Sequence, residues 1–391
     1  MKPKIRFSSS NILYEEKTLS EISTINPKTN VPLEFEYVDL ESVSGTEMTN
    51  HRTEHKATAP SRAQRLAKKG DIFYQTVRPY QKNNYYFDMD DDNYVFSTGY
   101  AQIRPSIYGK YLFTLLQNDS FLKQVLDNCA GTSFPAINPS VLSRLSVRIC
   151  KDKQEQQAIA SYFTSLDSQI SASTSRLASL KQMKAASLQA MFPQEGETVP
   201  KIRFKGFEGE WKKVKADSIF KTFNEKNRPD LPVLSATQDR GMVTRESIGY
   251  NIFHDTSNEA TYKHILPGQF VIHLRSFQGG FAHSEIEGIA SPAYTIMDFK
   301  NKDLYHDYYW RYVFMSKEFI KRLELITYGI RDGRSISYDE FKEMSFLVPS
   351  KEEQIKIASY LKNLDRQISL QSQRLEKLKQ IKSACLDKMF V

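Results

Sequence analysis

The sequence has few of the features that mark membrane, secreted and disulfide-bonded proteins. Only three cysteines, Cys129, Cys150 and Cys385, occur in 391 residues, an odd and widely spaced set that fits a reducing compartment and matches no zinc-ligand pattern. No apolar run is long enough to span a bilayer, and the N-terminal segment MKPKIRF lacks an apolar signal core. We therefore expect a cytoplasmic protein with no membrane partner and no metal site.

Motifs that would perform a reaction are also scarce. The seven histidines form no HExxH-type pair, and no P-loop is present. Ser291–Tyr294 is close to the Asn/Asp/Ser-Pro-Pro-Tyr motif of amino-methyltransferases, but it lacks the second proline and no Gly-rich cofactor loop follows a strand. The carboxylates of Asp88–Asp92 lack the turn glycine and closing glutamate of a calcium loop, and an acidic surface loop is the simpler interpretation. We expect no catalytic residues and no cofactor in this chain.

The composition is that of a folded protein with two or three domains. Hydrophobic residues make up 40% of the chain, which contains 24 Phe and 21 Tyr. Lys and Arg number 54 against 46 Asp and Glu, giving a net charge of +8. This excess favours a polyanionic partner, although many basic proteins bind none.

One long segment occurs twice. Gln154–Phe192 and Glu352–Phe390 match at a constant offset of 198 residues, so that Tyr162 corresponds to Tyr360. Internal repetition at a fixed period indicates a duplicated architecture. The repeat extends beyond this segment, because Pro3–Phe7 recurs as Pro200–Phe204.

Both copies of the segment predict long helices, because neither contains Gly or Pro and their apolar residues step by threes and fours. Each apolar stripe also carries a polar residue, Ser173 or Gln371, and a lysine, Lys184 or Lys382. The simplest arrangement is an antiparallel, coiled-coil-like pair, and the alternative is two ordinary amphipathic helices in a mixed core. The residues expected to pack this pair are Ile159, Phe163, Leu166, Ile170, Leu177, Leu180, Ile357, Leu361, Leu364, Ile368, Leu375 and Leu378.

Each half of the chain is thus a variable globular region followed by a long helix. The aromatic and β-branched runs Asp71–Val77 and Tyr94–Ile103 predict strands, and Lys110–Cys129 and Asp307–Thr327 have helical spacing. The predicted fold class is α+β: an internal duplication of two globular regions separated by two long antiparallel helices. The expected boundaries are 1–151 for the first region, 152–192 for its helix, 193–199 for a linker, 200–349 for the second region and 350–391 for its helix.

These features together resemble the specificity subunit of type I restriction–modification systems. The resemblance is carried by the two variable regions, the two near-identical helices, the EQ-x-x-IASY start of each helix and the segment Lys201–Lys213, KIRFKGFEGEWKK. One departure is that Lys4–Phe7 continues into SSSNILYEEK rather than repeating GFEGEW. The resemblance covers essentially the whole chain, while the globular regions match only in outline.

The resemblance implies a set of partners. In that family each variable region is a target-recognition domain that reads one half of a bipartite site in double-stranded DNA, and the repeated helices hold these domains apart and bind two modification (methyltransferase) subunits. The modification subunits would bring S-adenosylmethionine, and motor–nuclease (restriction) subunits would bring ATP and magnesium. Two other interpretations remain open: a bipartite DNA-binding regulator without methyltransferase partners, and a free-standing methyltransferase.

The predicted helices have a length that suits a gapped DNA site. A helix of about 38 residues spans roughly 57 Å, and one turn of DNA measures roughly 34–36 Å. Two recognition domains held by such a pair could reach half-sites about one turn apart. The site should be asymmetric, because the backbone halves are alike while the reading surfaces differ.

Candidate DNA contacts lie in loops at matched places of the two regions. Arg and Lys neutralise phosphates, and Arg, Asn and Gln are the usual bidentate readers of guanine and adenine. For any one of these residues, a solvated surface side chain is an equally simple interpretation. The candidates are Arg62, Lys68, Arg78, Tyr80, Gln81, Lys82 and Asn83 in the first region, and His273, Arg275, Gln278, Arg331 and Arg334 in the second.

Overall fold

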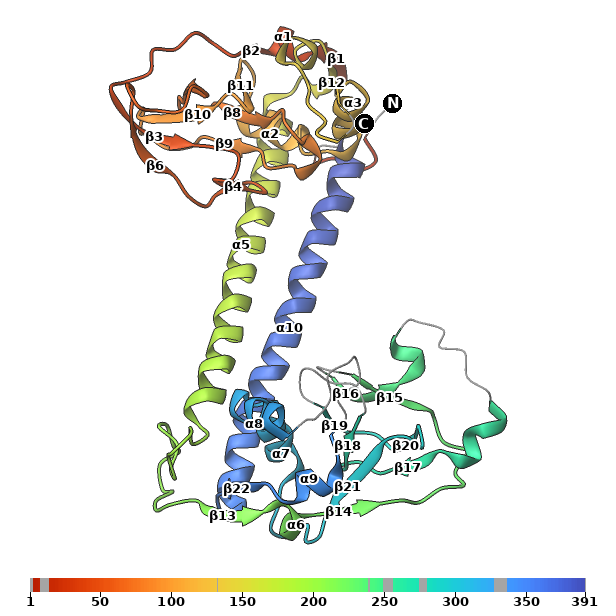
Figure 1. The fold of residues 1–391 in the computed structure, drawn as a ribbon. Helices are drawn as coiled ribbons and strands as arrows, with labels where there is room; N and C mark the ends of the chain where they lie inside the picture. Colours follow the sequence, from red (N-terminus) through yellow and green to blue (C-terminus); the bar gives the residue numbers. More distant parts are fainter. Residues whose placement is uncertain are drawn as a thin grey trace. The chain divides into compact units, whose positions relative to one another are not determined.

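The chain divides into two compact units in the computed structural model (Figure 1). The structure describes residues 3–7, 14–131, 133–237, 240–248, 256–273, 280–326 and 336–390, with the backbone alone for 256–258 and 324–326. Unit 1 comprises Met1–Thr174 and Gln373–Val391, and unit 2 comprises Ser175–Ser372. Each unit therefore combines one globular region with one end of each long helix, α5 (Lys153–Ala190) and α10 (Lys351–Met389).

Unit 1 contains two four-stranded sheets and two smaller pairings. The first sheet is antiparallel, and the second includes one parallel pairing, between β10 and β3. The first sheet has the order β2 (Ser23–Ile25), β11 (Tyr100–Pro105), β8 (Ile72–Gln75), β9 (Tyr85–Tyr86); the second has the order β6 (Arg52–His55), β3 (Glu34–Val38), β10 (Tyr94–Ser97), β7 (Ala63–Leu66). The smaller pairings are β1 (Tyr14–Thr18) with β12 (Ser146–Cys150), and the hairpin β4 (Val43–Ser44) with β5 (Glu47–Met48).

Strand β8 lies between two hydrophobic cores of unit 1, which explains why all its side chains are apolar or buried. Successive side chains of a strand point to opposite faces. Ile72 and Tyr74 accordingly join the core that contains the start of α5, whereas Phe73 joins a separate core and stacks on Phe96 with ring centroids 3.6 Å apart. The short helices of unit 1 are α1 (Leu19–Ile22), η1 (Pro79–Gln81), α2 (Gly109–Leu115), α3 (Asp119–Asp127) and α4 (Pro139–Leu142).

Unit 2 repeats part of this plan, with fewer strands among its described residues. Its four-stranded sheet packs on an aromatic core that includes Phe220, Trp310 and Phe314. The sheet has the order β14 (Phe220–Phe223), β21 (Thr295–Phe299), β18 (Phe270–Ile272), β19 (Phe281–His283), and the paired strands are β13 (Lys212–Lys215) with β22 (Ser345–Val348), β15 (Leu234–Thr237) with β16 (Gly241–Thr244), and β17 (Lys263–Ile265) with β20 (Gly288–Ala290). The helices are α6 (Ala216–Ile219), η2 (Arg245–Ile248), η3 (Thr256–Thr261), α7 (Asp307–Met315), α8 (Lys317–Ile326) and α9 (Tyr338–Lys342).

The predicted α+β class and internal duplication are confirmed, but two local predictions are corrected. The single strand expected at Tyr94–Ile103 is two strands in different sheets, separated at Gly99, where a side chain would collide with Leu40. The helical run Lys110–Cys129 is interrupted before Asn118, whose side chain accepts from the backbone N–H of Ser120 and caps α3. Its counterpart breaks at Ser316 between α7 and α8.

The two long helices run side by side (Figure 1) and make matched side-chain contacts in each unit. In unit 2, Lys184 forms an ion pair of 2.6 Å with Asp365. In unit 1, Lys382 pairs with Asp167, and these residues occupy the corresponding positions of the repeat. Because partners from opposite ends of the helices meet, the pair is antiparallel, as predicted.

The apolar stripe of the helices consists of buried and half-buried side chains. The buried members are Ile159, Phe163, Leu166, Leu180, Ile357, Leu361 and Leu364, and the half-buried members are Ile170, Leu177, Ile368, Leu375 and Leu378. The buried members near each helix start also join the core of the adjoining globular region. Burial of this kind contributes about 25 cal/mol per Å² of apolar area, so each helix start is fixed to the sheets beside it.

The repeated PKIRF segments lie across the helix ends in both units. The backbone N–H groups of Lys4 and Ile5 donate to the carbonyl of Lys388 at 2.8 and 3.1 Å, and that of Ile202 donates to the carbonyl of Ala190 at 2.9 Å. In unit 2, Arg203 forms a bidentate pair with buried Glu353 at 2.7 and 2.8 Å. The corresponding residues of unit 1, Arg6 and Glu155, approach to 3.8 Å.

Candidate nucleic-acid interface

The loop that follows β8, residues 78–84, holds five of the predicted DNA contacts. Arg78 and Lys82 both have left-handed backbone conformations, with φ of 55° at each, and they flank the single turn of η1. Such conformations cost non-glycine residues of order 1–3 kcal/mol and persist only where the surroundings fix them. Arg78, Tyr80 and Gln81 are exposed, and Tyr80 retains 50% of its accessible surface.

The side chain of buried Gln75, at the end of β8, organises this loop. Its amide nitrogen donates to the carbonyl of Val77 and to Oε1 of Gln81, both at 2.7 Å. Its Oε1 accepts from the backbone N–H of Asn83 at 3.2 Å. A buried amide with this many partners stabilises one loop geometry, because any other geometry leaves polar atoms unsatisfied.

Lys82 pairs with another residue of the protein rather than presenting a free ammonium group to a ligand. Its Nζ forms an ion pair with Asp119 at the start of α3 and donates to the carbonyl of Gln117 at 3.3 Å. The prediction that Lys82 contacts DNA stays a prediction, but this lysine must first leave Asp119 to do so.

The β4–β5 hairpin lies beside the loop. The backbone N–H of Gly45, at the tip of the hairpin, donates to Oδ1 of Asn83 at 2.9 Å. Gly45 has φ of 61° and open space around its α-carbon, so the backbone here is both tightly turned and accessible. The hairpin and residues 78–84 therefore form one continuous edge of unit 1.

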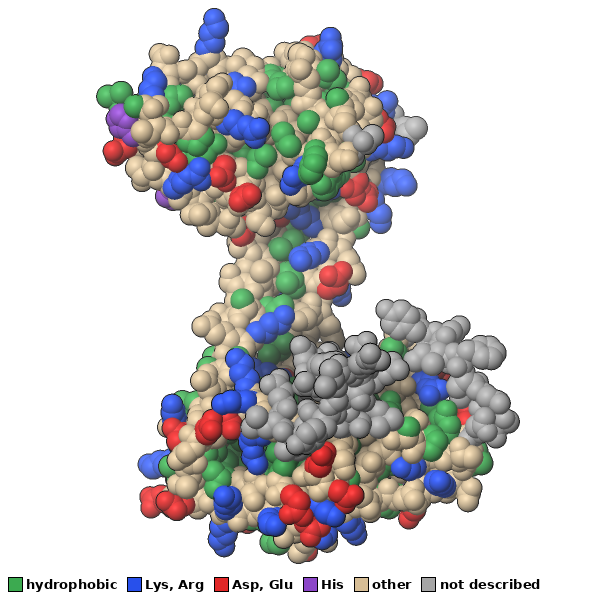
Figure 2. Space-filling model, in the orientation of Figure 1, with side chains coloured by type: hydrophobic (Ala, Val, Ile, Leu, Met, Phe, Trp, Pro, Cys, Tyr) green, Lys and Arg blue, Asp and Glu red, His purple; other side chains and the backbone are tan. Residues whose placement is uncertain are grey.

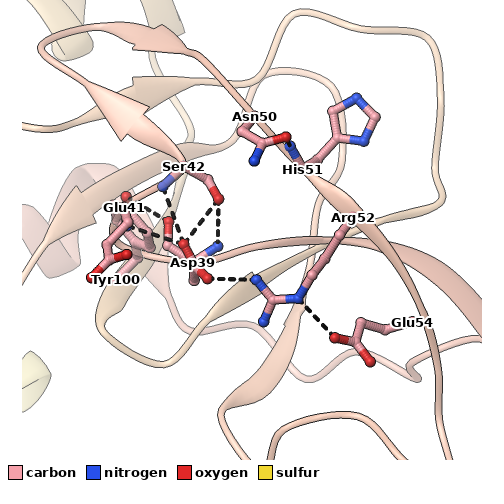
Figure 3. Close-up of polar contacts among 8 residues, drawn as sticks. All are labelled: Asp39, Glu41, Ser42, Asn50, His51, Arg52, Glu54 and Tyr100. Atoms are coloured by element: carbon pink, nitrogen blue, oxygen red, sulfur yellow. Dashed lines mark hydrogen bonds and ion pairs between the residues drawn. The ribbon is translucent and has the colours of Figure 1, made fainter.

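Asp39 fixes the base of the hairpin (Figure 3). Its Oδ1 accepts from the hydroxyl and backbone N–H of Ser42 at 2.9 and 3.1 Å and from the backbone N–H of Glu41 at 3.0 Å, while Oδ2 accepts from Nη1 of Arg52 at 2.7 Å. Arg52 also donates to Glu54 at 2.8 Å and lies 4.8 Å from the ring centroid of Tyr37. Burial opposes the ionisation of Asp39, but these hydrogen bonds outweigh it and lower its pKa.

The other predicted contacts of unit 1 lie at opposite ends of β8. The carbonyl of Arg62 accepts from the backbone N–H of Thr98 at 2.8 Å. Gly99, which follows Thr98, accepts through its carbonyl from the backbone N–H of Thr76 at 2.9 Å, just after β8. These two bonds place the backbone of Arg62 at the end of β8 that leads into residues 78–84. Lys68 instead precedes β8. The structure thus brings Arg62 toward the loop and leaves Lys68 at the other end of the strand.

A buried ion pair anchors the start of β8. Asp71 is 1% exposed and accepts two bonds from Arg104, at 2.8 and 2.7 Å, and one from the backbone N–H of Lys68 at 2.9 Å. In unit 2, Gln269 takes the place of Asp71: its Oε1 accepts from the backbone N–H of Leu266 at 2.8 Å, and its amide donates to Asp298 at 3.0 Å. The same turn is therefore built from different polar pairs in the two units.

In unit 2 the described residues include one predicted contact, His273. Its ring lies 6.4 Å from that of Tyr294, between centroids. Arg275, Gln278, Arg331 and Arg334 lie outside the described residues.

Charge is mixed on the molecular surface. Figure 2 shows Lys and Arg side chains interspersed with Asp and Glu on the visible face of each unit, without a continuous basic patch. Asp88 and Asp90, from the acidic run noted above, pair with Lys110 and Lys69 at 2.6 Å each. On this face, therefore, charge alone does not identify a binding surface.

Neither metal-binding nor membrane-spanning features are found where the structure can be described. No group of three or more His, Cys, Asp or Glu side chains suited to a metal ion occurs in the described part of the chain. Among the described residues, no helix combines the length and apolar character that crossing a membrane requires.

Sequence reasoning missed two neighbours of the 78–84 loop, Gly45 and Phe134. Phe134 lies under the guanidinium of Arg78, 4.6 Å from it, and is 62% exposed. The two residues are distant from Arg78 in sequence, so periodicity gave no signal for them. The sequence offered one indication of a surface role for Phe134, which is a large aromatic residue in a loop bounded by Gly131 and Pro135.

Comparison with known proteins gives consistent results. The model of the family described as type I restriction modification DNA specificity domain matches residues 11–182 and 208–380. The HindI type I restriction enzyme specificity subunit of Haemophilus influenzae is 34% identical over 139 residues, a match that covers 34% of this chain and 30% of that relative's length.

Solved structures show the same fold. The type I restriction–modification S subunit from M. genitalium superposes with a TM-score of 0.65 at 16% identity, over 100% of this chain and 99% of that one. A chain from a study of complex assembly and conformational transition of the type I R-M system superposes with a TM-score of 0.54 at 20% identity, over 97% and 98% of the two chains.

Proposed function

This chain belongs to the type I restriction–modification DNA specificity family, and we propose from this premise that it selects the DNA site of a type I restriction–modification complex. Each globular region reads one half of a gapped, asymmetric site in double-stranded DNA. The helix pair sets the length of the gap and carries two modification subunits. The chain itself performs no reaction and acts in the cytoplasm.

One observation carries the proposal: the units share their helix contacts and differ in their loops. The ion pairs Lys184–Asp365 and Lys382–Asp167 occupy corresponding positions, as do the contacts Ser187–Tyr360 and Tyr162–Cys385, at 3.3 and 3.4 Å. The first region in contrast has a second four-stranded sheet and the β4–β5 hairpin, which have no counterpart in the described part of the second region. A shared scaffold with unlike reading surfaces fits two different half-sites and two copies of one partner.

Exposed apolar side chains at corresponding positions support the docking of that partner. Met183 and Ile381 occupy the same position of the repeated helix and are 49% and 36% exposed. Ile202 and Ile5, in the PKIRF segments, are 59% and 37% exposed. Isolated exposed apolar residues are common, but their recurrence at matched positions fits two similar protein interfaces.

The remaining chemistry resides in the partners. The modification subunits bring S-adenosylmethionine and methylate adenine, and motor–nuclease subunits bring ATP and magnesium when restriction occurs. This chain determines the DNA site at which both activities act.

Copurification with the modification subunit tests the proposal. The wild-type chain should hold two modification subunits, measured by light scattering of the complex. Met183→Glu or Ile381→Glu alone should reduce the number to one, and the two together should abolish binding, because a buried charge opposes docking. Gln182→Glu adds the same charge at a neighbouring exposed position and should leave two subunits bound.

Two outcomes would contradict parts of this account. Retention of both modification subunits by the double variant would show that these side chains lie outside the docking surface. Failure of the wild-type chain to bind any modification subunit, while it still binds gapped DNA, would instead identify a bipartite DNA-binding regulator.

A further inference from the structure

The guanidinium of Arg78 is held above an aromatic ring at the surface of unit 1. Its central carbon lies 4.6 Å from the ring centroid of Phe134. Lys69, Lys82 and Lys110 of the same unit each pair with an aspartate, whereas Arg78 has no ion pair among the described residues. An arginine carries five N–H donors, and those of Arg78 are available to a ligand.

The backbone around Arg78 is fixed on both sides. Its N–H donates to the carbonyl of Pro135 at 2.8 Å, and the preceding residue, Val77, forms a β-bridge with Ala136. The same contacts hold the segment that carries Phe134 beside the loop. The left-handed conformation of Arg78, with φ and ψ of 55° and 54°, is therefore imposed by the surrounding structure.

A guanidinium that lies over an aromatic ring has fewer accessible orientations than a free one, and orientation distinguishes a base reader from a phosphate contact. Arginine can bind phosphate bidentately as well, but a phosphate contact also accepts lysine and carries no sequence information. Guanine presents two coplanar acceptors, O6 and N7, in the major groove, and the planar fork of arginine matches them bidentately. An arginine stacked on a ring loses less freedom on forming such a pair.

We propose that Arg78 reads a guanine in the half-site recognised by the first globular region, with Phe134 as the positioning residue for its guanidinium. This inference rests on the proposed function, because it assigns one base contact within that recognition surface. Exposed Tyr80 and Gln81 follow Arg78 in the same loop.

The experiment uses the full specificity–modification complex and two readouts. The first is the methylated motif mapped on genomic DNA, and the second is selection of bound sequences from a duplex library randomised over the first half-site. The variants are Arg78→Ala, Arg78→Lys and Phe134→Ala, each checked for wild-type thermal unfolding. Lys123→Ala, which removes an exposed cation from α3, is the matched control for loss of charge.

We expect Arg78→Ala and Arg78→Lys to accept other bases at one guanine of the first half-site, with discrimination reduced roughly tenfold to hundredfold. Lysine keeps the charge but lacks the fork, so Arg78→Lys should bind DNA more tightly than Arg78→Ala while reading it equally poorly. Phe134→Ala should relax the same position by a smaller factor. The second half-site should be unchanged throughout, and Lys123→Ala should keep the wild-type motif.

Three results would overturn the inference while leaving the proposed function intact. The first is a first half-site that contains no G·C pair, and the second is a wild-type methylated motif in the Arg78→Ala variant. The third is uniformly weaker DNA binding by Arg78→Ala without a change in base preference, which would make Arg78 a phosphate contact. Absence of any gapped motif with the wild-type chain would instead reject the proposed function itself.

Discussion

Single buried or half-buried polar residues fix the geometry of the surface that we assign to DNA. Gln75 holds residues 78–84, Asp39 holds the β4–β5 hairpin, and Asp71 holds the turn before β8. Each of these side chains forms hydrogen bonds with backbone groups of a loop. These bonds offset the free-energy cost of desolvating the side chain and stabilise one conformation of the loop. Substituting them should alter stability and recognition together.

Asp71→Asn should destabilise the protein by about 3 kcal/mol, the lower end of the range for removing one charge of a buried pair, because Arg104 is 34% exposed. The free energy of unfolding of the full-length chain in guanidinium chloride measures this loss. Lys69→Ala, which breaks the solvent-screened pair with exposed Asp90, should cost much less stability than Asp71→Asn. Equal losses in the two variants would contradict the assignment of Asp71 as an anchor.

Asp39 should make the stability of the protein sensitive to acid. Hydrogen bonds lower the native pKa of Asp39 below its ordinary 3.8 despite its burial. A carboxyl group with a lowered native pKa contributes stability above its ordinary pKa and loses it as the pH falls through the native pKa. The melting-temperature difference between wild type and Asp39→Asn should therefore be constant near neutral pH and shrink below about pH 4.

Melting curves recorded from pH 7 to pH 3 test this expectation. The exposed substitution Asp92→Asn serves as the control, and its melting temperature should follow that of the wild type. A difference for Asp39→Asn that persists undiminished at the lowest pH would show that the Asp39 carboxylate contributes no linked stability.

At the scale of elements, the helix pair depends on a few matched contacts placed within an apolar stripe. Asp365 accepts from both Lys184 and the hydroxyl of Tyr312, at 2.6 and 2.7 Å, and so links α5, α7 and α10 in unit 2. In unit 1, Asp167 meets Lys382, and Thr114 stands where unit 2 has Tyr312. The contact is therefore better connected in unit 2.

Lys184→Ala should destabilise the chain by about 1 kcal/mol, because the pair it breaks is partly screened, with Lys184 and Asp365 19% and 30% exposed. A double-mutant cycle with Asp365→Ala isolates the interaction energy from chemical-denaturation data. The equivalent cycle on Lys382 and Asp167 is the internal control and should give a similar or smaller value. A coupling energy of zero in unit 2 would contradict a stabilising role for this pair.

Elements defined by long periodic patterns could be predicted from the sequence, whereas the breaks between short elements could not. The stripe from Ile159 to Leu180 predicted α5 because an uninterrupted period favours one structure over many residues. The break between α2 and α3 depends on the cap at Asn118, which competes with helix continuation only in its tertiary context. Likewise Gly99 separates β10 from β11 because Leu40 packs against it.

The candidate site was predicted only in part for the same reason. Arg78, Tyr80 and Gln81 share one loop in the sequence and in the structure, so local reasoning grouped them correctly. The ion pair between Lys82 and Asp119 spans 37 residues, and no local pattern predicts such a contact. The position of Phe134 under Arg78 likewise depends on how distant loops pack.

At the scale of the whole molecule, the proposed function assigns recognition of the half-site bases to the globular regions and the distance between half-sites to the helices. The globular regions differ in their strands and loops, while the helices and the PKIRF segments repeat their contacts. On the proposed function, half-site sequence and gap length are therefore independent properties. A change confined to the helices should alter one and not the other.

Inserting one heptad after Ser171 in α5 and one after Ser369 in α10 should lengthen the gap without changing the half-sites. Seven helical residues advance roughly 10.5 Å, which corresponds to about three base pairs at 3.4 Å each. Matched insertion preserves the packing stripe, because these serines occupy corresponding positions of the repeat. The methylated motif gives the result, and altered half-site bases or an unaltered gap would contradict this division of roles.

The measurement that tests the central claim most directly is a genome-wide map of adenine methylation with and without this chain, in cells that contain its modification subunit. The account predicts that one gapped, asymmetric motif is methylated when the chain is present and unmethylated when it is absent. An identical methylation map in both cases would contradict the claim that this chain selects the site.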